Sequence, residues 1–119
     1  ILSCIINLGR DIMIIKCNNK EFPLVICNSF FSRLKGFMFY KKDITYALLF
    51  KKCKSIHTFF MYQDISVIFT DKDNKVLAYY PIITPNKILI GPKKTTNTYE
   101  LSPSFFKEDI INKIIEIKK

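Results

Sequence analysis

The sequence predicts a mainly β (α+β) fold, a small antiparallel β-barrel or rolled sheet with one short helix inserted after the second strand. β-branched and aromatic residues gather in short runs of strand length, and Asn-rich or Asp-rich turns separate several of these runs. A helical pattern interrupts them between the second and third runs. Many short strands around one brief helix are typical of a small barrel or rolled sheet.

Six apolar runs are expected to form the main strands. They cover residues 12–17, 22–28, 46–50, 56–61, 65–70 and 75–80. Two further runs, at residues 86–91 and 97–102, extend the series. Residues 113–118 end with alternating apolar and charged side chains, which predicts a half-exposed closing strand.

Turn residues separate these runs. Residues 18–21 and 71–74 are rich in Asn and Asp, which tolerate a left-handed backbone and bond to their own backbone, so both segments predict hairpin connections. Pro81, Pro85 and Pro92 bracket a segment in which regular strand pairing is not expected.

Residues 29–37 break the strand pattern and predict the short helix. Ser29 can cap the amides that follow it, and Gly36 offers a left-handed stop. Apolar residues recur at helical spacing in this segment: Phe30, Leu34 and Phe37. This helix would carry Arg33 near its C-terminal end. A second, brief helical turn is expected after the Ser-Pro pair at residues 102–103.

The length of 119 residues suits one hydrophobic core, so residues 12–119 are expected to form a single globular β domain. Residues 1–11 are expected to be an N-terminal tail or an extra strand. Gly9, Arg10 and Asp11 interrupt this apolar segment well short of the ~18 residues that a membrane-spanning helix needs. No membrane span is therefore predicted.

The net charge of +9 would suit an anionic partner. Lysines supply nearly all of the positive charge, and they are scattered along the chain with no run of five or more, which predicts a solvated surface and disfavours nucleic acid as a partner. Arginine occurs only at positions 10 and 33. Because the chain otherwise uses lysine for its positive charges, the arginine at position 33 suggests that a guanidinium group is needed there.

The cysteines do not have the spacing of a metal site. They are Cys4, Cys17, Cys27 and Cys53, without a C-x-x-C pair, and His57 is the single histidine. We therefore expect no metal and reduced, mostly buried thiols, which predicts a cytoplasmic protein. Three glycines in the whole chain are too few for a glycine-rich nucleotide loop, and no cofactor is predicted.

Three stretches of the chain resemble one known family. The stretch "SRLKGFMF" (32–39) is followed by "CKSIHTFFMYQDISVIFTDKDNKVL" (53–77) and by "YELS" (99–102). In order and spacing they are similar to the domain of unknown function 192 family, whose pattern includes R-x-x-G-[LF]-M, C-x-S-I-H-T-x-x-M and a later Leu-Glu pair. The resemblance covers residues 22–117 and implies a small, mainly β domain of bacteria or archaea without an established activity.

The chain departs from that family in two turns. The family usually has glycine in the turn after the Leu-Glu pair and in a Gly-Asp pair before the last strand. This chain has Ser102–Ser104 and Glu108–Asp109 in these places. Both turns must form without glycine, so a site loop built from them would be altered.

Six polar residues are candidates for one site at strand and helix ends. The candidates for catalysis are His57, Asp64 and Glu100, and those for ligand binding are Arg33, Thr58 and Ser55. Histidine side chains ordinarily change charge near neutral pH, so His57 could act as a general base, with Asp64 or Glu100 orienting its imidazole. Arg33 could hold a planar anion with its guanidinium fork. The structural alternatives are a bridge from Arg33 to either acid and a half-buried histidine at a barrel corner.

Strand alternation over residues 56–61 would place His57 on the same side as Phe59 and Met61, with Thr58 and Phe60 on the other side. In an extended strand Cys53 would lie about 13 Å from His57, too far for a thiolate–imidazole pair.

The leading functional hypothesis is an uncharacterised binding or accessory module with a polar cleft that recognises a small anionic ligand, a peptide or a protein partner. The alternative is a hydrolase or lyase that uses His57 as general base, a carboxylate as orienter and Arg33 as anion stabiliser. A third hypothesis, nucleic-acid binding through lysines and exposed tyrosines, has the least support. The sequence identifies neither the ligand nor the oligomeric state.

Overall fold

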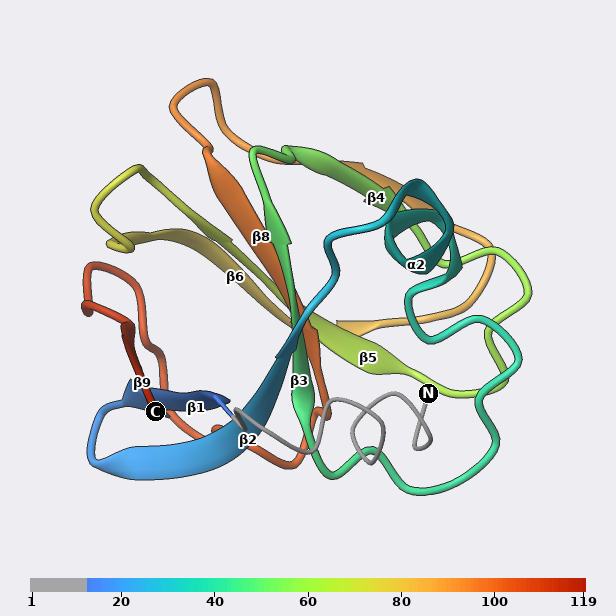
Figure 1. Ribbon diagram of the computed structural model, residues 1–119, viewed down its shortest axis with the longest axis horizontal. Helices are drawn as coiled ribbons and strands as arrows, with labels where there is room; N and C mark the ends of the chain where they lie inside the picture. The colour runs from blue at the N-terminus through green and yellow to red at the C-terminus, as the bar shows by residue number, and fades with distance from the viewer. Residues whose placement is uncertain (1–12) are drawn as a thin grey trace.

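The computed structural model describes residues 13–119 as a mainly β structure (Figure 1). The strands are β1 (Met13–Cys17), β2 (Lys20–Ile26), β3 (Ala47–Lys51), β4 (Ser55–His57), β5 (Ile65–Thr70), β6 (Val76–Ile83), β7 (Ile88–Ile90), β8 (Asn97–Leu101) and β9 (Glu116–Lys118). The one helix among these residues is α2 (Phe30–Lys35). The tail or extra strand expected over residues 1–11 lies outside the described residues.

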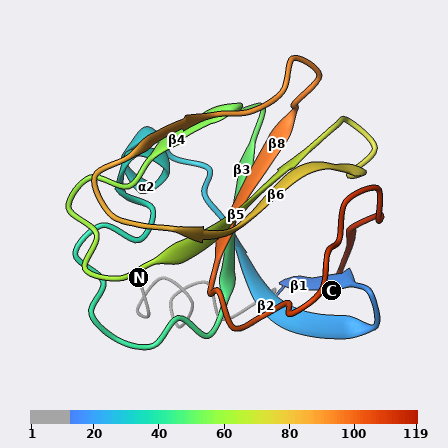
Figure 2. The same cartoon turned by 180° about the vertical axis from the view of Figure 1, so that it is seen from behind.

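Seven strands form one curled sheet in the order β6-β5-β8-β3-β2-β1-β9, and β4 and β7 form a second, two-stranded sheet. Figures 1 and 2 show the strongly twisted strands of the large sheet as an open half-barrel, with α2 and β4 at one end and β1, β2 and β9 at the other. The predicted fold, a rolled sheet with one short helix after the second strand, is confirmed.

One pair of neighbouring strands is parallel, although an antiparallel sheet was expected. β2 and β3 run in the same direction, with Leu24 opposite Ala47 and Ile26 opposite Leu49. Parallel neighbours need a crossover connection, because a hairpin returns the chain in the opposite direction. Residues 27–46 make this crossover, and they include α2. The parallel pair therefore requires the long connection that carries the inserted helix.

The two expected hairpin turns are confirmed. Asn18 and Asn19 join β1 to β2 with φ of 54° and 67°, the left-handed values that a two-residue hairpin turn requires. Between β5 and β6, Asn74 has φ of 61°, and the Asp71 side chain accepts the backbone N–H groups of Asp73 and Lys75. Both turns use the local chemistry that their sequence predicts.

The strand expected over residues 56–61 is wrong beyond His57. β4 ends there, because Thr58 turns inward: its hydroxyl donates to the Thr84 carbonyl and accepts the Lys87 N–H, each at 2.8 Å. Phe59 is exposed and Met61 is buried, so the predicted alternation fails.

One further local prediction is wrong, and another is confirmed in part. The segment after the Ser-Pro pair at 102–103 forms turns and bends instead of a helical turn. β6 continues as a strand through Pro81 to Ile83, but its pairing with β5 is irregular there, because the register shifts between the pairs Val67–Tyr80 and Ile65–Ile83. This strand lies at the edge of the sheet, where proline is tolerated because its missing N–H costs no pairing partner.

The two faces of the large sheet carry separate apolar cores. One core joins β1, β2, β8 and β9 to the segment at residues 105–110, while the other contains Phe37, Tyr46 and Met61 together with residues of β3 and β5. The central strands β3 and β5 are buried on both faces over nearly their whole length, which is why their sequences are mostly apolar. Glu100 lies in β8 opposite Leu48 and Val67 of the second core, so its carboxyl group is placed among apolar side chains.

Asn74 connects the β5–β6 turn to the first core. Its Oδ1 accepts hydrogen bonds from the hydroxyl groups of Tyr99, at 2.9 Å, and Thr70, at 3.3 Å, and from the Asn97 amide at 3.2 Å. We expect Asn74→Ala to lower the free energy of unfolding by about 1.5–2 kcal/mol, because the buried Tyr99 hydroxyl loses this acceptor. Urea denaturation measures the loss, and equal midpoints for the variant and the parent chain would contradict it.

Candidate functional site

Hydrogen bonds bring α2 and the segment around His57 to the same side of the molecule. An Arg33 guanidinium nitrogen, Nη1, donates to the Lys51 carbonyl at the end of β3, at 2.7 Å. The Phe39 N–H donates to the Phe60 carbonyl at 2.9 Å, and the Gln63 amide donates to the carbonyls of residues 40 and 42. Residues 29–42 and 51–63 together are called the α2–β4 flank.

Arg33 is held in place by only part of its guanidinium group. It lies in the last turn of α2, which begins at a Ser29 capping box and ends at Gly36, and it is partly buried. The bond to Lys51 uses one nitrogen of the fork. No ion pair in residues 13–119 includes Arg33, so the alternative of a bridge to Asp64 or Glu100 is not formed there. The guanidinium is therefore positioned by Lys51, without an acidic partner in the described residues.

His57 ends β4, and its imidazole is oriented by the next residues. Its Nδ1 accepts the Phe59 N–H at 3.1 Å, and the two rings stack with centroids 5.2 Å apart. Because Nδ1 is an acceptor, a neutral imidazole must carry its proton on Nε2. The ring therefore presents an N–H donor at Nε2, and this tautomer cannot take up a proton there.

The other three candidates on or near the flank have different surroundings. Ser55 is exposed two residues before His57 in β4, so the two side chains share one face of the strand. The Thr58 hydroxyl is buried and already makes two hydrogen bonds. Asp64 is exposed just before β5, and no hydrogen bond or ion pair in the described part of the chain joins it to His57. Cys53 donates its S–H to the Ser55 carbonyl at 3.1 Å.

Glu100 lies beneath the turn that follows α2. Its carboxyl group is buried and accepts the backbone N–H of Phe37, while Oε1 has no hydrogen-bond partner. Burial raises the pKa of Glu100 from 4.5 to about 8, so the side chain is mostly neutral at pH 7. A Cβ at Gly36 would lie 2.8 Å from Oε1. The structure thus places Glu100 against the Gly36–Phe37 turn, where it contacts the backbone rather than the imidazole of His57.

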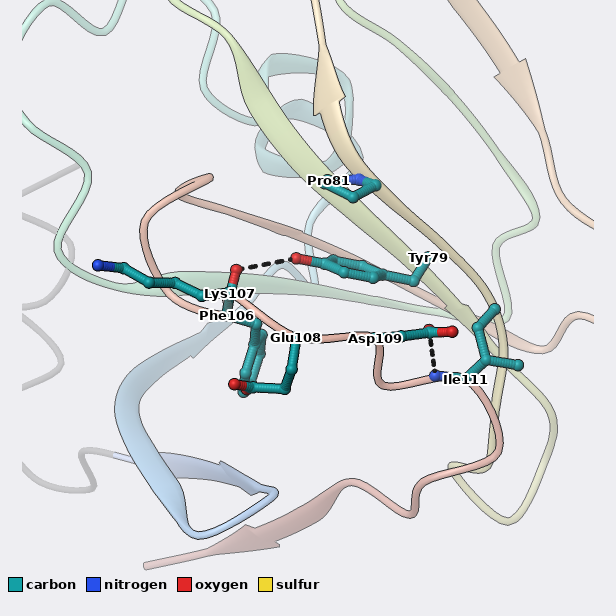
Figure 3. A pocket seen from close by; sticks show the side chains of 7 residues that line it. All are labelled: Tyr79, Pro81, Phe106, Lys107, Glu108, Asp109 and Ile111. Atoms are coloured by element: carbon teal, nitrogen blue, oxygen red, sulfur yellow. Dashed lines mark hydrogen bonds between the residues drawn. The ribbon is translucent and has the colours of Figure 1, made fainter.

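A pocket that was not predicted from the sequence lies on the other face of the sheet (Figure 3). It has a volume of about 360 Å³ and lies between β6 and the segment at residues 106–111. Tyr79 donates its hydroxyl to the Phe106 carbonyl at 3.3 Å, and Asp109 accepts the Ile111 N–H at 2.9 Å. Glu108 also lines the pocket and pairs with Lys20 at 3.6 Å. The glycine-free turn at residues 108–109 was the sequence feature that marked this segment.

Residues 13–119 hold neither a cluster of metal ligands nor a membrane-spanning helix. No three His, Cys, Asp or Glu side chains gather there as a metal site. No helix in this part of the chain has the length and apolar character needed to cross a bilayer.

Comparisons with known proteins place the fold in one family. The model of the domain of unknown function 192 family, described as "Uncharacterized ACR", matches residues 13–117. A protein of unknown function from Novosphingobium aromaticivorans has a similar structure, with a TM-score of 0.72, 13% identity, and coverage of 91% of this chain and 84% of that chain. A candidate transcription regulator from Sinorhizobium meliloti has a TM-score of 0.70 at 12% identity, with coverage of 87% and 90%. No curated protein sequence matches this chain.

Proposed function

Because the chain belongs to the domain of unknown function 192 family, which is uncharacterized, we propose its function from the geometry of the α2–β4 flank. We propose a binding or accessory module that recognises a small anionic ligand, or an anionic group of a peptide or protein partner. The observation that carries the proposal is the Arg33 guanidinium, which is anchored by the Lys51 carbonyl without an acidic partner in the described residues.

Two further groups support an anion-binding role. The His57 ring is fixed by the Phe59 N–H, so its Nε2–H is a donor of defined direction. Ser55 adds a hydroxyl on the same face of β4. A charged fork, an imidazole N–H and a hydroxyl are suitable donors for a carboxylate or a phosphate. In this proposal Thr58 fixes the loop after β4, because both of its hydrogen bonds are to backbone groups.

The hydrolase or lyase hypothesis has less support from the same contacts. A general base needs an open nitrogen lone pair, and the neutral tautomer of His57 uses its lone pair to accept the Phe59 N–H. The carboxylate that was to orient the imidazole is also missing from its surroundings, since Glu100 accepts the Phe37 N–H and is mostly neutral. Binding of an anion without catalysis requires neither an open lone pair on His57 nor a carboxylate that orients its imidazole.

We further propose that the protein acts in the bacterial cytoplasm. Cys17 and Cys53 are free thiols, and Cys53 is partly exposed. Burial raises the pKa of Cys17, which keeps this thiol protonated. Free thiols of this kind suit a reducing compartment.

Titration with inorganic phosphate, followed by the NMR resonances of the Arg33 and His57 side chains, tests the proposed site. We expect saturable shifts of both side chains. Arg33→Lys should weaken binding at least ~5-fold, because lysine keeps the charge but lacks the two-pronged geometry. His57→Gln should weaken it by a smaller factor, because only one donor is displaced.

Lys35→Gln is the matched control, since it removes a positive charge from the same last turn of α2 and leaves the guanidinium in place. It should bind phosphate within about 2-fold of the parent chain if the fork is specific. Equal losses in the Lys35 and Arg33 variants would instead show a diffuse charge effect and contradict the proposed site.

A further inference from the structure

Three exposed aromatic rings form a cluster on the α2–β4 flank. Phe39 stacks on Phe60 with centroids 5.6 Å apart, and Tyr62 lies 6.2 Å from Phe39. Their exposed fractions are 53%, 61% and 57%. Buried cores fill both faces of the large sheet without these rings. The three residues, called the aromatic cluster, therefore leave an apolar surface in water.

The backbone at this cluster is strained. Phe39 and Phe60 each have φ of 63°, a left-handed conformation that bulky side chains rarely adopt. The two strained residues are joined directly, because the Phe39 N–H donates to the Phe60 carbonyl at 2.9 Å. Glycine or asparagine would satisfy the same turns with less strain. Strained residues of this kind are often found at functional sites.

The strain and the exposure both act against the stability of the isolated fold, and docking on an apolar surface would offset them. We propose that the aromatic cluster, together with Lys41 and Lys42, docks the protein onto the surface of an anionic phospholipid bilayer. Phenyl and phenol rings enter the boundary between headgroups and acyl chains, while lysines remain at the level of the lipid phosphates. This inference rests on the proposed function, because it identifies the lipid phosphate as the anion that the flank meets.

The distribution of charge favours an anionic surface. Lys41 lies over the Tyr62 ring at 5.1 Å from its centroid, and residues 30–43 carry four basic side chains and one acid, Asp43. Asp64 is the other exposed acid beside the cluster. Other exposed acids lie on β2, on β9, in the β5–β6 turn (Asp73) and at residues 108–109, away from α2 (Figure 1). The full chain carries +9, so an anionic bilayer would attract it. Because most exposed acids lie away from the α2–β4 flank, this flank would face the bilayer.

The other occupants fit less well. A second copy of the chain would bring another +9 against the cluster, so charge repulsion opposes a dimer through this face. Single-stranded nucleic acid needs ring faces on which bases can stack. Here Phe39 and Phe60 already stack on each other and Lys41 covers one face of Tyr62.

Vesicle co-sedimentation of the full chain tests the inference. The probes are vesicles of phosphatidylcholine alone and vesicles of phosphatidylcholine mixed equally with phosphatidylglycerol. We expect binding to the mixed vesicles that is at least ~10-fold stronger than to the neutral ones. Phe39→Asn/Phe60→Asn should reduce the binding at least ~10-fold while the fold persists, because asparagine tolerates φ near 63°. A higher melting temperature of this variant would show directly that the strain was relieved.

Ile82→Ser/Ile114→Ser is the matched control, because it removes two similarly exposed apolar side chains from other segments. It should bind the mixed vesicles like the parent chain. The inference is overturned if the parent chain binds neither kind of vesicle or binds both kinds equally. It is also overturned if Phe39→Asn/Phe60→Asn binds the mixed vesicles as strongly as the parent chain does. Loss of binding to a single-stranded oligonucleotide in the Asn variant, without vesicle binding by the parent, would overturn it in favour of nucleic acid.

The phosphate titration separates the two proposals. If phosphate shifts Arg33 and His57 while the mixed vesicles do not bind, the bilayer inference fails and the anion site stands. If Phe39→Asn/Phe60→Asn no longer binds the mixed vesicles but still binds phosphate, both the anion site and the bilayer inference are supported. If phosphate produces no shift, the anion site fails, and the bilayer inference, which depends on that site, fails with it.

Discussion

Gly36→Ala is expected to lower the free energy of unfolding by about 3 kcal/mol. Two costs add in this variant. Gly36 has φ of 48°, which an L-residue adopts only with strain, and its new Cβ would lie 2.8 Å from Oε1 of Glu100. The buried carboxyl group would have to move within a packed core, and the Phe37 N–H would lose its alignment with it. Urea denaturation at pH 7 measures the loss.

A double-mutant cycle with Glu100→Ala separates the two costs. In the Glu100→Ala background the carboxyl oxygen is absent, so Gly36→Ala should cost only the backbone strain of about 1–2 kcal/mol. Lys35→Ala, one residue earlier, is the positional control and should change stability by less than about 0.5 kcal/mol. An equal cost of Gly36→Ala in both backgrounds would show that Glu100 does not determine the need for glycine.

Strands and turns were predictable where local chemistry decides them. The run at residues 65–70 is apolar apart from Ser66 and Thr70. It became β5 with the same bounds, because both of its faces are buried. The two asparagines at positions 18 and 19 were sufficient to predict the hairpin turn, because both adopt the left-handed backbone that it requires. The parallel pairing of β2 and β3 was not predictable, because it depends on where a distant strand finds its partner and not on any local pattern.

The candidate site itself stays a prediction. The structure shows that α2, which carries Arg33, and β4, which carries His57, lie at the same end of the molecule (Figure 1). The sequence could not show that Thr58 would end β4, since two backbone groups from residues 84 and 87 hold its hydroxyl. The aromatic cluster was missed for the same reason: Phe60 was assigned to a strand, although its left-handed backbone places its ring in solvent.

The buried acid in β8 should make the stability of the protein depend on pH in an unusual direction. The pKa of Glu100 is about 8 in the fold, above the ordinary value of 4.5 that the group has in the unfolded chain. Between these two values the native state holds a proton that the unfolded chain releases, so the free energy of unfolding should fall as pH rises. We expect a loss of roughly 3 kcal/mol between pH 5 and pH 7.5 from this group.

Glu100→Gln tests this expectation, because an amide cannot ionise and its oxygen can still accept the Phe37 N–H. The difference in unfolding free energy between the variant and the parent chain should grow in favour of the variant from pH 5 to pH 7.5 and level off above pH 8. Glu116→Gln, on the exposed strand β9, should give a difference that stays flat over the same range. Parallel curves for Glu100→Gln and the parent chain would mean that the carboxyl group ionises freely in the fold, with water or a cation reaching it beneath the Gly36 turn.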